Sequence, residues 1–130
     1  MTKTRPLIAF VDDEESIRKA LTRLMRSAGL DAETFDSGAA FLKSIDTRPP
    51  DCVVLDLHMP QMNGFAVQAH LAKLHAAVPV IIITGHHSPT DRARAMAGGA
   101  SAYLRKPVND RALLDAISTA VAGANGANEH

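Results

Sequence analysis

Two short apolar runs that end abruptly in carboxylates constrain the fold of this chain more than any other feature. Leu7–Val11 is wholly apolar and is followed at once by Asp12 and Asp13. Residues 52–55 repeat that design and are followed by Asp56. A short apolar run without alternating polar positions is typical of a strand buried on both faces of a parallel sheet. Such a sheet needs helices on both faces, which predicts an α/β protein.

Three more strands and five helices are predicted along the chain. The strands cover residues 32–35, 78–83 and 102–104, and the second of these is expected at or near the centre of the sheet. Apolar stripes at helical spacing predict helices through residues 17–28, 41–45, 67–74 and 113–121, and a short Ala-rich helix should end at Gly98 and Gly99. This alternation predicts a doubly wound, flavodoxin-like fold whose five parallel strands lie in the order 2-1-3-4-5.

The length of the chain, 130 residues, is that of one domain. We expect residues 1–122 to form this domain. The small and polar tail GANGANEH, residues 123–130, is expected to be flexible or to begin a linker. Cys52 is the single cysteine, which excludes an intramolecular disulfide framework and a multi-cysteine zinc site, and its place in an apolar run indicates an inert core residue.

The charge balance bears on partners and on the cellular compartment. Lys and Arg number 14, as do Asp and Glu, so the chain lacks the basic excess that supports binding to nucleic acid. No apolar run approaches the ~20 residues that span a bilayer, and the acidic pair after MTKTRPLIAFV argues against a secretory signal peptide. We therefore expect a cytoplasmic protein that binds neither nucleic acid nor membrane directly.

Polar side chains follow four of the predicted strands, where the functional crevice of an open parallel sheet lies. Asp12 and Asp13 follow the first strand, Asp56 the third, Thr84 the fourth and Lys106 the fifth. Three adjacent carboxylates repel one another unless a proton, a basic group or a hard divalent cation lies between them. Oxygen ligands favour Mg²⁺, which commonly works beside a phosphoryl group. Lys106 and the Thr84 hydroxyl then suit the remaining phosphoryl oxygens.

Four segments in this order, VDDEE, VVLDLHMPQMNGF, IIITGH and GASAYLRKP, resemble the receiver domain of bacterial two-component response regulators, and the resemblance covers about residues 5 to 122. It implies that Asp56 accepts a phosphoryl group from a phosphohistidine of a sensor histidine kinase. It also implies that Mg²⁺ is held by Asp13, Asp56 and the backbone carbonyl of His58, with Asp12 acting mainly through water.

The resemblance further implies a signalling switch that catalyses only its own phosphoryl transfer and dephosphorylation. Thr84 and Tyr103 would carry the conformational change, with Tyr103 turning from an exposed to a buried rotamer, and the Lys106–Pro107 bond would be cis. The surface of the fourth helix, fifth strand and fifth helix is expected to bind an output domain, a downstream protein or, on phosphorylation, a second copy of the chain. His58 and His86 occupy positions that tune the lifetime of the acyl phosphate in the family, and histidine at the first is a departure.

Four alternative interpretations remain open at this point. A nucleotide-binding flavodoxin-like protein is disfavoured because VDDEES lacks the glycines that let backbone amides approach a phosphate. A phosphatase with an aspartate nucleophile would need a second acid at the place of His58, and a binding module without phosphorylation would not need the full set of strand-end residues. Transition-metal binding by His58, His86 and His87 is disfavoured because the nearby carboxylates suit magnesium.

Overall fold

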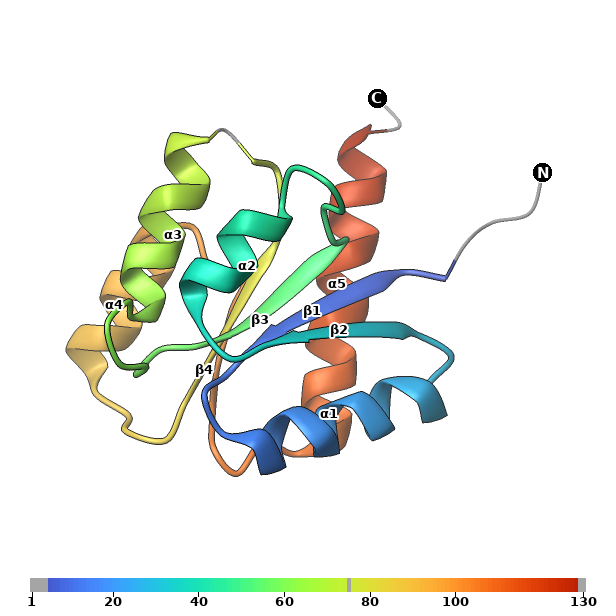
Figure 1. The fold of residues 1–130 in the computed structure, drawn as a ribbon, viewed down its shortest axis with the longest axis horizontal. Helices are drawn as coiled ribbons and strands as arrows, with labels where there is room; N and C mark the ends of the chain where they lie inside the picture. Colours follow the sequence, from blue (N-terminus) through green and yellow to red (C-terminus); the bar gives the residue numbers. More distant parts are fainter. Residues whose placement is uncertain (1–4, 75, 129–130) are drawn as a thin grey trace.

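The computed structural model describes residues 5–74 and 76–128, in which five strands alternate with five helices (Figure 1). The strands are β1 (Leu7–Val11), β2 (Asp31–Phe35), β3 (Cys52–Asp56), β4 (Val80–Thr84) and β5 (Ala102–Arg105). The helices are α1 (Glu15–Ser27), α2 (Gly38–Ser44), α3 (Gly64–Lys73), α4 (Pro89–Ala97) and α5 (Asp110–Asn128). All strand pairs are parallel and the order is β2-β1-β3-β4-β5, which confirms the predicted fold.

The core lies in two layers, one on each face of the sheet. Strands β1, β3 and β4 are buried along their whole length, as their continuous apolar runs predicted. Val54 and Ile81 pack with side chains of α1 and α5 on one face, whereas Leu55 and Ile82 pack with those of α2, α3 and α4 on the other. Successive side chains of a strand point to opposite faces, so each inner strand contributes to both layers. The edge strands β2 and β5 are partly exposed.

Side chains cap the starts of four helices, and at α5 the Asn109 side chain accepts a hydrogen bond from the Ala112 amide. The Ser37 hydroxyl accepts a hydrogen bond from the Ala40 amide at the start of α2, and the Asn63 side chain accepts one from Ala66 at the start of α3. At the start of α4, the Ser88 hydroxyl accepts a hydrogen bond from the Asp91 amide at 3.2 Å. These caps satisfy amides that have no partner within the helix and so define where each helix begins. The loops that lead into them follow the carboxyl ends of the strands, where the polar residues gather.

Two element boundaries differ from those predicted. Strand β4 begins at Val80 and not at residue 78, because Pro79 has no N–H to donate to a ladder. Helix α5 continues to Asn128, through most of the segment predicted as a flexible tail. Each glycine costs only about 1 kcal/mol in a helix that the packed part of α5 has already nucleated. Residues 129–130 lie outside the described residues, and the domain boundary at residue 122 stays a prediction.

The described part of the chain contains no helix that combines the length and the apolar character needed to cross a bilayer.

Candidate functional site

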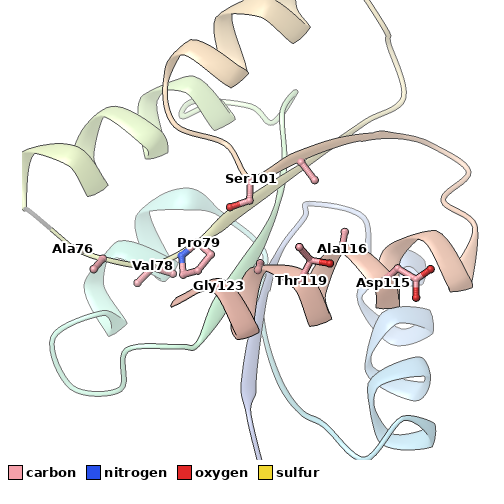
Figure 2. Close-up of a pocket in the computed structure, with 11 residues that line it drawn as sticks. Ala76, Val78, Pro79, Ser101, Asp115, Ala116, Thr119 and Gly123 are labelled. Carbon is pink, nitrogen blue, oxygen red and sulfur yellow. The ribbon is translucent and has the colours of Figure 1, made fainter. Parts of the chain in front are cut away.

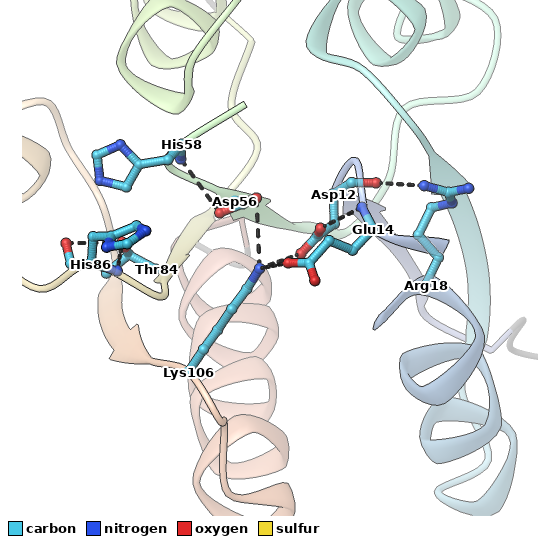
Figure 3. A network of polar contacts seen from close by, with 8 residues as sticks. All are labelled: Asp12, Glu14, Arg18, Asp56, His58, Thr84, His86 and Lys106. Atoms are coloured by element: carbon cyan, nitrogen blue, oxygen red, sulfur yellow. Dashed lines mark hydrogen bonds and ion pairs between the residues drawn. The ribbon is translucent and has the colours of Figure 1, made fainter. Parts of the chain in front are cut away.

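The carboxyl ends of four parallel strands bring the predicted site residues to one edge of the sheet (Figure 3). Asp12 comes directly after β1, Asp56 and Thr84 are the last residues of β3 and β4, and Lys106 comes directly after β5. Asp12, Asp56 and Thr84 are buried, with exposed fractions of 1%, 3% and 0%. Burying polar groups is costly unless they have partners, so their concentration at this edge marks a site rather than a core.

Lys106 is the positive centre of this site. Its ammonium nitrogen Nζ lies 2.9 Å from Asp12 Oδ2, 3.1 Å from Glu14 Oε1 and 3.6 Å from Asp56 Oδ2. Figure 3 shows the side chain reaching up from the end of β5 between Asp56 on one side and Asp12 and Glu14 on the other. The Lys106–Pro107 bond is cis, as the resemblance implied. One ammonium group thus contacts three carboxylates, which leaves the cluster with excess negative charge.

Glu14 and Arg18 also belong to the site, and the sequence analysis missed both. Glu14 contacts Lys106, and its amide donates a hydrogen bond to Asp12 Oδ1 at 2.9 Å. Arg18 donates from Nη1 to the backbone carbonyl of Asp12 at 2.8 Å. The spacing of the two residues, four positions apart at the start of α1, puts both on the side of the helix that faces the end of β1. This spacing was the sequence feature from which the two residues could have been assigned to the site.

Electrostatics give Asp56 an unusual proton affinity. Burial and the charge of Asp12 raise its pKa from the ordinary value of 3.8 to about 6, although Lys106 and the His58 amide partly oppose the change. For Lys106, burial alone would lower the pKa, but contact with Asp12 and the charge of Asp56 outweigh it and raise the pKa. Asp56 is therefore ionised at neutral pH, yet remains more basic than an exposed carboxylate.

Three carboxylates gather closely enough to hold a cation. One oxygen each from Asp12, Asp13 and Asp56 lie within 4.8 Å of one another, and in the described ranges no other set of three acid, imidazole or thiol side chains does so. Asp12 and Asp56 are buried and Asp13 is exposed. Asp12 Oδ2 is enclosed but receives no well-aligned hydrogen bond, even though Lys106 Nζ is 2.9 Å away. A set made only of carboxylate oxygens fits a hard divalent cation such as Mg²⁺.

The side chains of two histidines lie on the other side of Asp56, away from Lys106. The His58 amide contacts Asp56 Oδ1 at 3.4 Å, while its ring lies 3.6 Å from Asp91 Oδ2 and edge-on to the ring of His86. The Thr84 hydroxyl accepts a hydrogen bond from the His86 amide at 3.0 Å and donates one to the His86 carbonyl at 3.2 Å. The Thr84 hydroxyl is thus already bonded within its own loop.

The position of the Tyr103 side chain differs from the expected one. The side chain is half-buried on β5, its hydroxyl oxygen is enclosed without a hydrogen-bond partner, and its ring packs edge-on against His87. The structure places the Tyr103 ring half-buried, whereas an exposed rotamer was expected before phosphorylation. Its ring packs against the apolar layer of α2, α3 and α4, and this packing favours the inward position.

Two further features lie away from this edge. A cavity of about 720 Å³ opens between α5 and the chain segments that lead into β4 and β5, at the opposite end of the strands (Figure 2). Among the described residues of its lining, Asp115 is the one titratable group, so these residues offer little chemistry. Cys52 is buried at the start of β3, and desolvation, with a smaller contribution from Asp51, raises its pKa to about 12. A thiol held in that form is unreactive, in agreement with the predicted core role.

Comparisons with known proteins agree with this geometry. The sequence profile of the response regulator receiver domain family matches residues 8–118. Nodulation protein W of Bradyrhizobium diazoefficiens is 40% identical over 117 residues, which are 90% of this chain and 52% of that protein. The DNA-binding transcriptional regulator NtrC of Escherichia coli is 38% identical over 103 residues, or 79% of this chain and 22% of NtrC. The chain thus spans about half the length of Nodulation protein W and less of NtrC.

Solved structures show the same similarity in three dimensions. The crystal structure of FixJ-N superposes with a TM-score of 0.83 and 33% identity, covering 92% of this chain and 95% of that one. The response regulator StyR superposes with a TM-score of 0.85 and 36% identity, covering 97% of this chain and 64% of that one.

The raised pKa of Asp56 predicts how stability depends on pH. Folded Asp56 keeps its proton up to about pH 6, whereas the unfolded chain releases it near 3.8, so its ionisation lowers the free energy of unfolding as pH rises through this window. Without divalent cations, Asp56→Asn should be more stable than the wild type by about 3 kcal/mol above pH 7 and equally stable below pH 4.

Urea unfolding across this pH range measures the effect. The exposed Asp46 provides a matched control, since Asp46→Asn should leave the pH dependence of the wild type unchanged. An Asp56→Asn protein less stable than the wild type near neutral pH would contradict the assignment.

Proposed function

This chain belongs to the receiver domain family of response regulators, the signalling switches of two-component systems, and we propose that Asp56 is the residue that accepts the phosphoryl group. The observation that carries the proposal is the position of this buried carboxylate, with Lys106 Nζ 3.6 Å from one oxygen and two further carboxylates beside it. We propose the phosphohistidine of a sensor histidine kinase as the donor.

In the reaction, an Asp56 oxygen attacks the phosphorus atom, the new O–P bond forms and the bond from phosphorus to the donor's imidazole nitrogen breaks. A carboxylate with a pKa of about 6 is ionised at neutral pH and more nucleophilic than one with an ordinary value. Lys106 is already at 3.6 Å and supplies positive charge as negative charge builds on the phosphoryl oxygens. The protein contributes positioning and charge, which is what phosphoryl transfer demands.

Mg²⁺ fits the carboxylate set of this site. Asp13 and Asp56 are the proposed direct carboxylate ligands, with the His58 carbonyl, and Asp12 acts mainly through water. The enclosed Oδ2 of Asp12, which lacks a well-aligned hydrogen bond, supports a role in holding such a water. When bound, the ion neutralises charge that Lys106 cannot offset alone.

Thr84 and Tyr103 are the proposed switch. For its hydroxyl to contact a phosphoryl group on Asp56, Thr84 must give up its hydrogen bond to the His86 carbonyl, which requires residues 85–88 to rearrange. His87 lies in that loop against the Tyr103 ring, so the rearrangement reaches β5 directly. The face formed by α4, β5 and α5 would then change and bind an output domain, a downstream protein or a second copy of the chain.

The first prediction of this proposal concerns the phosphorylation site. Incubation with acetyl phosphate and Mg²⁺ should add a single phosphoryl group, seen as one mass increment of the intact protein, because one carboxylate combines burial, Lys106 and the cation site. Asp56→Asn should abolish the adduct. The control Asp46→Asn should be labelled like the wild type, and equal labelling of the Asp56→Asn protein would overturn the assignment.

The second prediction concerns the metal. Mg²⁺ should bind weakly, and Asp13→Ala should weaken binding by about tenfold or more, because Mg²⁺ prefers carboxylates and water over imidazole. His58→Ala keeps the backbone carbonyl and should retain binding. Amide chemical shifts in a magnesium titration measure both. Loss of binding in the histidine variant alone would instead support a histidine site.

The third prediction separates phosphorylation from switching. Thr84→Ala should still be phosphorylated at Asp56 but should lose the change in the ring signals of Tyr103 that beryllofluoride induces in the wild type. Thr90 is exposed on α4, so Thr90→Ala serves as the matched control and should keep the response. Ring signals that change undiminished in the Thr84→Ala protein would show that the coupling follows another route.

A further inference from the structure

The arginines and lysines of this chain are unevenly distributed, and many of them line a groove beside the edge strand β2. Two adjoining hollows of about 450 and 460 Å³ share Thr22 and Arg26 and together form this α1–β2 groove. Helix α1 runs alongside β2 at that edge of the sheet (Figure 1). The basic residues of the lining are Arg5, Arg18, Lys19, Arg23, Arg26 and Arg48, and the acidic ones are Glu15 and Asp31.

The groove is strongly positive although the chain has a net charge of zero. It collects six of the 14 basic side chains and two of the 14 acidic ones. Lys19 pairs with Glu15 at 3.3 Å, and Arg18 is bound to the Asp12 carbonyl. Within residues 5–74 and 76–128, the other four guanidinium groups of the lining form no ion pair. An ordinary solvated helix face would explain the basic residues of α1. It would not explain why Arg5 and Arg48, which lie outside α1, line the same groove.

The backbone of β2 offers a second kind of recognition in the same groove. β2 pairs with β1 alone, so its other edge is open. The Asp31 amide donates to the Pro6 carbonyl and the Phe35 carbonyl accepts from the Asp12 amide, so the odd-numbered positions face β1. Strand periodicity then directs the N–H and C=O groups of Ala32 and Thr34 outward, and both residues line the groove.

We propose that the α1–β2 groove binds an acidic segment of a partner protein in extended conformation, as an added strand on β2. Its backbone would pair with Ala32 and Thr34, and its carboxylates would meet guanidinium groups, which bind carboxylates through paired hydrogen bonds. Nucleic acid fits less well, because the lining contains no aromatic side chain on which a base could stack. This surface lies on a different face from α4, β5 and α5, and the proposal does not depend on phosphorylation.

A synthetic peptide of about eight residues with alternating Glu and Val tests the proposal, labelled for fluorescence anisotropy and titrated into the full chain. The wild type should bind it, and the double change Arg23→Glu with Arg26→Glu should weaken binding by about tenfold or more. The matched control reverses two exposed arginines elsewhere, Arg92→Glu with Arg111→Glu, and should bind like the wild type.

Two modified peptides test the recognition without altering the protein. A peptide with Lys in place of Glu should not bind, and one that is N-methylated at alternate positions should bind more weakly, because it cannot donate to the open edge. The amide signals of Ala32 and Thr34 should shift with the unmodified peptide. The proposal is overturned if binding ignores the charge reversal, if the Lys peptide binds equally, if these amides do not respond, or if duplex DNA competes more strongly than the peptide.

Discussion

The interaction on which the rest of this structure depends is the contact of one partly buried ammonium group with several carboxylates at the end of a parallel sheet. Lys106 Nζ approaches Asp12, Glu14 and Asp56 within 3.6 Å, and two of these carboxylates are nearly inaccessible to water. Burial and the charge of Asp12 keep the pKa of Asp56 raised to about 6, although Lys106 opposes them. A site with excess negative charge attracts cations, while the single lysine keeps the cluster from being neutralised by protons at pH 7.

The fold positions that contact through elements distant in the sequence. The parallel strands fix where Asp12, Asp56 and Lys106 emerge, because a shift in register by one residue would move each side chain of a strand to the opposite layer of the core, where its shape no longer fits. The helices are held in turn by specific bonds: the buried Gln68 side chain on α3 donates to the Ala95 carbonyl on α4 at 3.0 Å. Arg18 holds the start of α1 against the end of β1. Positioning within the site is therefore a property of the whole sheet.

Much of this architecture could be predicted from the sequence, because its strongest signals are local. The runs LIAFV and CVVLD are too apolar and too short for anything but buried strands, and the strand-end rule then places Asp12, Asp56, Thr84 and Lys106 together. Features that depend on packing could not be predicted in this way. The inward Tyr103 side chain depends on the apolar layer around it, and the α1–β2 groove combines residues from four separate segments whose charge is hidden in a net total of zero.

The two hydroxyls of the proposed switch, those of Tyr103 and Thr84, differ in their hydrogen bonding. An enclosed hydroxyl without a partner costs about 1 to 3 kcal/mol, and apolar packing of the ring offsets that cost. The Thr84 hydroxyl is in the opposite condition, with two hydrogen bonds to its own loop. In the proposed switch, rearranging residues 85–88 would break hydrogen bonds at Thr84, whereas the Tyr103 hydroxyl has none to lose. The two states then differ by few bonds, so the roughly 5.5 kcal/mol that shifts an equilibrium from 1:99 to 99:1 lies within reach of a few charge-assisted hydrogen bonds at Asp56.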